Sequence, residues 1–422
     1  MQKKENMTQT IPAEPPTQFT GYQKFVLAIL AFLQFTIILD FMIMSPLGAI
    51  LMPALNITPS QFGVVVSAYA FSAGIAGFAA AGFADRFDRK KLLMFFYCGF
   101  ILGTFLCGIA PNFYFLLFAR IVTGLFGGVI GAIVMAITTD LFHFSMRGRV
   151  MGVLQTAFAG SQILGLPIGL YLSAHLGWHA PFMMIVGMAA IVGVVIIVNL
   201  KPIDAHLQLH PDRNPFHHLK TTIATPRYVL AFAATGFLSV GGYMLMPFSS
   251  AFSVNNLGIS MQELPMIYLV TGFGAIITGP LVGKLSDKFG KYRVFLFGAV
   301  MTIIMAVIYT RLGVTPLPMV ILVNVLLFVG IFSRMIPAQA MMSAVPAADS
   351  RGAFMAINSS LQQIAGGVGS VVAGMIVSQP AGGGAILHFD LLGDILVCTV
   401  LLTAVMMYFI HRMVATPVAV PA

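Results

Sequence analysis

The chain has 422 residues, of which 59% are apolar and 8% are charged, and its formal net charge is +9. Soluble domains carry about 25% charged residues, so this composition excludes an ordinary water-soluble protein, and its hydrophobicity excludes a disordered one. A helix that crosses a ~30 Å hydrocarbon core takes about 20 residues, so the apolar content suffices for about a dozen crossings. These figures predict an integral membrane protein.

The N-terminal segment, residues 1–24, is polar and rich in proline. It lacks the apolar core of a cleavable signal peptide, so we expect a disordered cytoplasmic tail followed by a first span that acts as its own insertion signal. Cys98, Cys107 and Cys398 lie in apolar runs without metal-ligand spacing, and we interpret them as small buried hydrophobic residues.

Twelve apolar segments follow in chain order, each long enough to cross a bilayer as a helix. They cover residues 25–53, 62–82, 92–110, 113–137, 150–174, 181–200, 228–250, 264–283, 294–311, 316–340, 353–378 and 391–411. None shows the ~10-residue alternation of an outer-membrane β-barrel. The sequence therefore predicts an all-α integral membrane fold with twelve transmembrane helices.

The basic residues lie between these segments and favour one side of the membrane. With the N-terminus inside, the cytoplasmic loops and tail contain Arg86, Arg89, Lys90, Lys91, Arg147, Arg149, Lys201, Arg213, Lys220, Arg227, Lys284, Lys288, Lys291, Arg293, Arg351 and Arg412. Only Arg311 remains outside. By the positive-inside rule we expect both termini to be cytoplasmic, in the cell (inner or plasma) membrane, and we expect no nucleic-acid partner.

The longest polar stretch inside the chain, residues 201–227, divides it into two sets of six spans. We expect an N-terminal bundle over residues 25–200, a cytoplasmic linker over 201–227, a C-terminal bundle over 228–411 and a cytoplasmic tail over 412–422.

The two halves also resemble each other. AGFADRFDRKK begins at Ala81 and GKLSDKFGKYR begins at Gly283, which places Asp85 and Asp287 202 residues apart. The Arg-Gly pairs that begin at Arg147 and Arg351 lie 204 residues apart. Two landmarks at nearly one offset predict a duplication, and transporters with parallel repeats bind substrate near the bilayer midplane between their halves.

These loops resemble the signature of the major facilitator superfamily, which runs roughly G-x-x-x-D-R-x-G-R-K after the second helix. The second copy keeps Gly283, Asp287 and Gly290. The first copy keeps Asp85, Arg86 and Arg89 but has Ala81 and Asp88 at the glycine positions. The resemblance extends over the whole chain in span count, orientation and repeat. It implies two pseudo-symmetric six-helix bundles around a central cavity that opens alternately to each side.

The resemblance also implies a latch that holds the two halves in the outward-facing state. We carry that role to Asp85, Arg86, Arg89, Asp140, Asp287 and Lys288. From the residues alone, Asp85 at a helix end can cap free N–H groups, and Arg89 can pair with Asp140 at the cytoplasmic end of the fourth span. The alternative is that these charges only fix topology.

Two further patterns resemble the drug:proton antiporters and the arabinose-efflux-like permeases of the same superfamily. Arg120 is followed by Gly124 and Gly128, and the fifth span contains Gly165, Pro167 and Gly169 in GSQILGLPIGLYL. Leu166 separates the glycine from the proline, which departs from the antiporter Gly-Pro dipeptide. Physically, the glycines allow close helix approach and Pro167 loosens the helix backbone. Small-residue packing without a role in coupling is the alternative.

Two ionisable residues lie deep in predicted spans, where a charge costs at least ~2.5–3.5 kcal/mol. Asp40 lies about 15 residues into the first span, near the midplane, whereas Arg120 lies about seven residues from the outer end of the fourth. We hypothesise that Asp40 takes up and releases a proton, and that Arg120 tunes this step or holds Asp40 when the site is empty. A static buried ion pair that specifies helix packing is the alternative. Contact between the two residues stays open at this stage.

Other polar and large side chains inside the spans are candidates for a substrate cavity: Gln34, Phe41, Met44, Tyr243, Met246, Asn324, Arg334, Asn358 and Gln362. For Arg334, snorkelling to the nearby cytoplasmic interface competes with contact to a substrate anion or a gate. For the amides, interhelical hydrogen bonds are the alternative, and for the apolar residues, packing or lipid contact is.

We therefore expect a secondary active transporter that exports a small drug-like or sugar-like compound in exchange for protons, by alternating access and as a monomer. A proton-independent uniporter or importer is the alternative within the fold, and a membrane-embedded enzyme or sensor is the alternative from another class. No nucleophile–base motif, Walker loop or dinucleotide fingerprint stands out, so we expect no enzyme activity and no cofactor. His206, His210, His217 and His218 in the linker are interpreted as solvated rather than as a metal site.

Overall fold

The computed structural model describes residues 18–80, 87–204, 221–346, 350–380 and 384–415. Within these residues the regular structure is helical, apart from one isolated antiparallel bridge between Ser378 and Leu387. The expected all-α fold is confirmed.

The first half contains α1 (Gly21–Ile43), α2 (Gly48–Leu55), α3 (Pro59–Ala80), α4 (Arg89–Gly108), α5 (Phe113–Leu141), α6 (Phe144–Gly160), the π-helical turn η2 (Ser161–Gly165), α7 (Leu166–Leu176) and α8 (Ala180–Asn199). The second half contains α10 (Pro226–Leu245), the 3₁₀ turn η4 (Met246–Phe248), α11 (Ser249–Asn255), α12 (Leu264–Phe289), α13 (Lys291–Thr310), α14 (Leu317–Met342), α15 (Arg351–Ile376) and α16 (Phe389–Ala415).

Eleven helical segments in the described residues are long and apolar enough to cross a bilayer. The predicted span 353–378 is the exception, although it corresponds to α15, a helix of 26 residues. Asn358, Gln362 and Gln363 interrupt the apolar sequence of α15 and lower its mean hydropathy. The helix tolerates them because it packs between α3 and α10 inside the protein. All twelve predicted segments therefore correspond to helices, and one of them is unusually polar.

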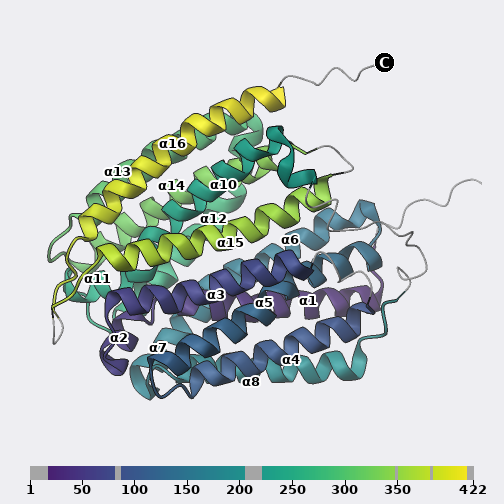
Figure 1. The fold of residues 1–422 in the computed structure, drawn as a ribbon, viewed down its shortest axis with the longest axis horizontal. Helices are drawn as coiled ribbons and strands as arrows, with labels where there is room; N and C mark the ends of the chain where they lie inside the picture. The colour runs from purple at the N-terminus through teal and green to yellow at the C-terminus, as the bar shows by residue number, and fades with distance from the viewer. Residues whose placement is uncertain (1–17, 81–86, 205–220, 347–349, 381–383, 416–422) are drawn as a thin grey trace, which may run out of the picture.

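The chain folds into two groups of helices that lie against each other (Figure 1). The purple to blue-green helices α1–α8 form one group, and the green to yellow helices α10–α16 form the other. We call the end at which α1 begins, α8 ends and α10 begins the linker end, and the end at which α5 and α14 begin the far end. The described basic residues that precede or follow helices lie at the linker end, except Arg311, which follows α13 at the far end.

Close contact between the groups occurs where α3 lies beside α15 (Figure 1). A Cβ atom added to Gly63 would lie 2.7 Å from the carbonyl oxygen of Ser370 and 3.2 Å from the Cα of Gly374. A Cβ added to Gly74, nearer the linker end, would lie 2.9 Å from the carbonyl oxygen of Ser360. Glycine therefore permits backbone contact along much of this interface, as small residues do between membrane helices.

Glycine also brings α5 against α3 inside the first group. A Cβ on Gly124 would lie 2.5 Å from the carbonyl oxygen of Tyr69, and one on Gly128 would lie 2.5 Å from the Cα of Ala73. Both distances are below van der Waals contact and involve backbone atoms, which cannot rotate away. The glycines after Arg120 thus fix how closely these two helices approach.

We predict that Gly128→Ala destabilises the protein by about 1–3 kcal/mol, because the new methyl group overpacks the α3–α5 contact. Gly131→Ala is a matched control one turn further along α5, where an added Cβ meets no atom within 4 Å. It should leave stability unchanged or raise it by up to about 1 kcal/mol through helix propensity. Thermal unfolding of both variants in detergent tests this. Equal midpoints would show that α3 and α5 are free to separate.

Candidate functional site

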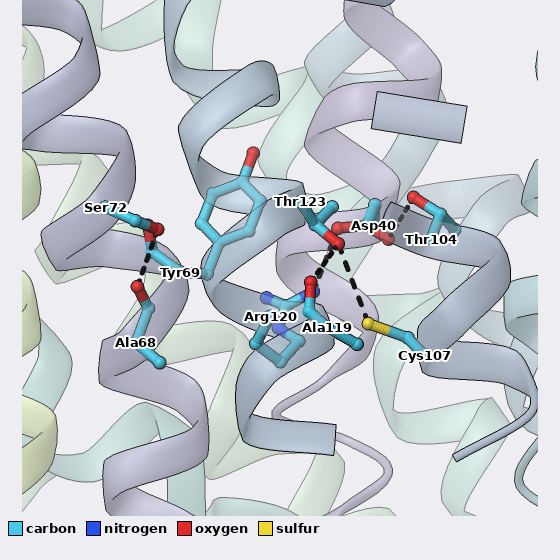
Figure 2. A network of polar contacts seen from close by, with 9 residues as sticks. All are labelled: Asp40, Ala68, Tyr69, Ser72, Thr104, Cys107, Ala119, Arg120 and Thr123. Atoms are coloured by element: carbon cyan, nitrogen blue, oxygen red, sulfur yellow. Dashed lines mark hydrogen bonds and ion pairs between the residues drawn. The ribbon is translucent and has the colours of Figure 1, made fainter. Parts of the chain in front are cut away.

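Helices α1, α4 and α5 bring three polar side chains together in the first group (Figure 2). The Arg120 Nη1 atom donates a hydrogen bond to Asp40 Oδ2 at 2.9 Å, and both side chains are 0% exposed. The hydroxyl of Thr104 donates to the other carboxylate oxygen, Oδ1, at 3.1 Å. Both oxygens of Asp40 are therefore paired with donors, which is what a buried carboxylate requires.

The contact is possible because Asp40 and Arg120 lie at nearly the same distance from the linker end. The sequence-based estimate had placed them at different depths. Helix α1 starts at Gly21 and ends at Ile43, so Asp40 lies 19 residues from the linker end, in the last turn of the helix. Arg120 lies 21 residues from the linker end of α5, which is Leu141. The placement of Asp40 near the midplane was wrong because the predicted first span, 25–53, included the break at residues 44–47 and the short α2.

The guanidinium group of Arg120 has a second neighbour, the ring of Tyr69 in α3. The Arg120 Cζ atom lies 4.6 Å from the centre of this ring, a cation–π distance. The Arg120 Nε and Nη2 atoms form no hydrogen bond in the described structure. One face of the cation is thus held by a carboxylate and another by an aromatic ring, so the cation keeps a partner if the carboxylate is neutralised.

The packing of α4 against α5 places Thr104 at the carboxylate. A Cβ on Gly103 would lie 2.7 Å from the backbone nitrogen of Thr123, so only glycine allows the two helices to approach there. The hydroxyl of Thr123 donates a hydrogen bond to the carbonyl oxygen of Ala119 at 2.8 Å. The same hydroxyl oxygen lies 3.7 Å from the sulfur of Cys107 (Figure 2). The interpretation of Cys107 as a small buried residue agrees with its 0% exposure, whereas Cys98 and Cys398 are exposed.

Aromatic rings connect this site to the second group of helices. Phe41 follows Asp40, and its ring lies 5.3 Å from that of Tyr69 and 5.8 Å from that of Tyr243 in α10. Tyr243 in turn lies against α15, where a Cβ on Gly366 would be 2.8 Å from its ring. Two residues predicted as cavity candidates, Phe41 and Tyr243, therefore meet across the two groups beside Asp40.

The π-helical turn η2 lies on another side of α1. A Cβ on Gly165 would lie 2.5 Å from Leu39 Cδ1, and one on Gly169 would lie 2.7 Å from Ile43 Cδ1. Pro167 follows the turn, at the start of α7. On its other side η2 meets α12, where a Cβ on Gly272 would be 3.3 Å from the carbonyl of Gln162. Gly165 at the end of the turn thus contacts the residue before Asp40, while the same turn touches the other group.

At the linker end, Arg89 Nε donates to Asp140 Oδ2 at 3.0 Å, as the sequence allowed. Asp88, which stands at a glycine position of the signature, caps α4 by accepting a hydrogen bond from the Lys91 amide at 3.1 Å. Asp85 and Arg86 lie outside the described residues. Asp287 and Lys288 lie in the last turn of α12 and are exposed.

The other cavity candidates have varied environments. Asn358 accepts a 2.6 Å hydrogen bond from the hydroxyl of Thr235 in α10. Asn324 donates to the carbonyl of Val320 within its own helix at 3.1 Å. Met44 is fully buried at the break after α1, whereas Met246 in η4 is half-buried, as are Gln34 and Gln362. The structure does not bring these residues together with Asp40 as one cluster.

The side chain of Arg334 is 1% exposed, so it does not reach the molecular surface. The snorkelling interpretation is therefore wrong. It failed because it judged depth from the end of the helix alone, whereas α13 packs against α14 at this level. A Cβ on Gly298 of α13 would lie 2.6 Å from the Arg334 backbone nitrogen.

Sequence reasoning missed Thr104 and Tyr69, which complete the surroundings of the ion pair. A single threonine in an apolar helix, or a tyrosine in an otherwise apolar one, has no periodic signal that points to a site. The linker histidines lie outside the described residues. In the part of the chain that the structure describes, no group of three or more His, Cys, Asp or Glu side chains is placed to hold a metal ion.

The comparisons with known proteins agree with this architecture. The family model of the Major Facilitator Superfamily matches residues 30–370 and 231–419, which together include nearly all of the spans. The chain belongs to the Major Facilitator Superfamily. It is thus a multi-pass membrane protein of a transporter family.

Its curated relatives include transporters of Bacillus subtilis (strain 168). The chain is 26% identical over 364 residues to the uncharacterised MFS-type transporter YceJ, which covers 84% of this chain and 90% of that protein. It is 26% identical over 295 residues to Multidrug resistance protein 2, covering 68% of this chain and 73% of that protein. Similarity to multidrug resistance proteins is thus present but distant.

Solved structures share the fold at low sequence identity. A bacterial homologue of the human lysosomal transporter Spinster, in an inward-facing and unoccupied conformation, matches with a TM-score of 0.73 and 17% identity, over 96% of this chain and all of that one. A mutant of the nucleoside transporter NupG matches with a TM-score of 0.72 and 13% identity, over 92% and 99% of the two chains. These likenesses establish the transporter fold.

We predict that Asp40 and Arg120 stabilise the fold only as a pair. Asp40→Leu leaves a buried cation without its carboxylate and should cost about 3–5 kcal/mol, whereas Asp40→Leu combined with Arg120→Leu should recover most of that loss. A double-mutant cycle of unfolding free energies in mixed micelles measures the coupling. Additive effects of the two substitutions would contradict a paired role.

Proposed function

We propose that this chain is a proton-coupled antiporter that exports a small organic compound, with Asp40 as the proton carrier. The observation that supports this most strongly is that Asp40 is the only buried acidic side chain among the described residues. Ionisable groups at membrane depth are costly and mark proton or substrate pathways in transporters.

In the proposed cycle, Asp40 exists in two states. As a carboxylate it accepts hydrogen bonds from Arg120 and Thr104. When a proton binds, the charge attraction to Arg120 is lost, and the cation is left to the ring of Tyr69, which it already faces. Protonation thus removes the strong contact between α1 and α5 and leaves the weaker, existing contact between α5 and α3. This provides the difference between states that coupling needs.

The change at Asp40 is transmitted to the second group of helices by direct contacts. Phe41 touches Tyr243, and η2, which packs against Leu39, also touches α12. We assign the two moving units to residues 25–200 and 228–411. Asp85, Arg86, Arg89, Asp140, Asp287 and Lys288 would form the latch between them. Arg89 and Asp140 pair within the first unit, so the contact with the second unit would come from this cluster as a whole.

Orientation and substrate class follow from the charges and the relatives. The basic residues at the linker end favour a cytoplasmic location for that end, and hence for both termini, in the cell membrane. The names of the relatives Multidrug resistance protein 1 and Multidrug resistance protein 2 favour export of drug-like compounds, with sugar-like metabolites as the second class. We expect the transporter to act as a monomer.

We predict that Asp40→Asn abolishes compound flux driven by an imposed pH gradient and leaves the protein folded, because the amide keeps the shape of the carboxyl but cannot carry a proton. The measurement uses purified protein in liposomes that contain a pH-sensitive dye. Compounds with permanent charge states avoid pH artefacts: naphthalenesulfonate, naphthalenesulfonamide and a naphthylmethyl-trimethylammonium ion.

The matched control is Asp394→Asn, which removes an exposed acidic residue paired with Arg311 at the far end. It should keep gradient-driven flux. Proton movement that depends on one compound and runs in the direction opposite to that compound identifies antiport. Flux down a compound gradient without proton movement, equal in wild type and Asp40→Asn, would replace the proposal with a proton-independent uniporter or importer.

A further inference from the structure

A second buried cation, Arg334, lies in the other group of helices. It is 17 residues from the start of α14 and eight residues before its end at Met342. Its side chain is 1% exposed, and its Nε and Nη1 atoms form no hydrogen bond. Among the residues that the structure describes, no acidic side chain forms an ion pair with it.

This arrangement differs from that of Arg120, whose charge is balanced by Asp40. A buried guanidinium without a counter-ion loses its hydration and gains no compensating attraction. Arg334 does not recover that loss at a surface, because its side chain is 1% exposed. The structure thus holds an uncompensated positive charge at membrane depth, and such groups mark substrate or ion pathways.

The set of buried charges determines which charge a ligand of Arg334 should carry. Apart from Arg89, which pairs with Asp140 at the linker end, the buried charged side chains in the described residues are Asp40, Arg120 and Arg334. The single negative charge is matched by one of the two positive charges. The remaining charge repels a cationic ligand and attracts an anionic one, and the attraction is strong where water is excluded.

We propose that Arg334 binds the anionic group of the transported compound, so that the substrate class is small organic anions bearing a carboxylate, sulfonate or phosphate. This rests on the proposed function as a transporter and adds the charge of its substrate. The planar guanidinium presents donors that match two oxygens of such a group at once. The free Nε and Nη1 atoms of Arg334 are the donors available for that contact.

The experiment measures thermal unfolding of the full chain in a neutral detergent with the same three naphthyl compounds. Naphthalenesulfonate should raise the midpoint of the wild type, whereas the neutral sulfonamide and the trimethylammonium ion should not. In Arg334→Met the apparent affinity for the sulfonate should fall about ten- to a hundredfold, which is the scale of charge-assisted hydrogen bonds. Arg334→Lys, which keeps the charge but not the fork, should lie between.

Arg293→Gln is the matched control, because it removes an exposed cation in the first turn of α13, the helix that packs against α14. It should leave the response to the sulfonate unchanged. The ligand-free Arg334→Met protein should be at least as stable as the wild type, since the substitution removes an uncompensated buried charge. A lower midpoint without ligand would instead assign Arg334 to folding and overturn the proposal.

Two further outcomes would also overturn it. One is an equal response of the wild type and Arg334→Met to the sulfonate, or no response of the wild type. The other is protection of the wild type by phosphatidylglycerol vesicles to the same extent as by the sulfonate, with no protection by phosphatidylcholine vesicles. That result would identify a lipid headgroup as the ligand. Asp40→Asn should retain the sulfonate response. Loss of proton coupling and loss of anion recognition are therefore measured by different variants.

Discussion

The ion pair between Asp40 and Arg120 constrains the whole first half, because neither charge has water to solvate it. A carboxylate and a guanidinium satisfy each other only at contact distance, so α1 and α5 must meet with those residues at one height, as the 2.9 Å hydrogen bond requires. The remaining helices follow from this demand. Gly103 lets α4 supply Thr104, and Gly124 lets α3 bring Tyr69 against the guanidinium. Small residues thus position the few polar groups that the bilayer makes expensive.

The two halves use buried charge differently. In the first half a negative and a positive charge face each other, so a proton that binds to Asp40 removes the attraction between them. In the second half Arg334 stands without an acidic partner in the described residues, so its state depends on what enters from outside the chain. In the proposed mechanism, a proton binds to the first half and an anion binds to the second half. Phe41 contacts Tyr243 and η2 contacts Gly272, so the two groups of helices meet beside Asp40.

Hydropathy and charge predicted the helices, their class and the grouping of basic residues, because the bilayer imposes those features on every span. Heights within the membrane were harder to predict. The break at residues 44–47 contains Ser45 and Pro46, but hydropathy alone does not register it, and it moved Asp40 from the expected midplane to the last turn of α1. Arg334 shows the same difficulty: its distance from a helix end suggested snorkelling, but its side chain is 1% exposed, and Gly298 of a different helix packs against its backbone. The burial of a side chain depends on which helices pack against its own helix. The sequence of a single span does not contain that information.

The predicted repeat shows where the linker ends of the two halves differ. At the offsets of 202 and 204 residues, Arg89 corresponds to Lys291, while Asp140 corresponds to Met342 or Ala344. The second half therefore has no acidic residue at the position that corresponds to Asp140. In its place the structure has a surface cavity of about 280 Å³ lined by Asp287, Lys291, Met341, Ala344 and His411. The charged loops recur in both halves, whereas the position that corresponds to Asp140 holds an uncharged residue in the second half. The linker ends of the two halves therefore differ: the first is held by an ion pair and the second has a cavity at the corresponding place.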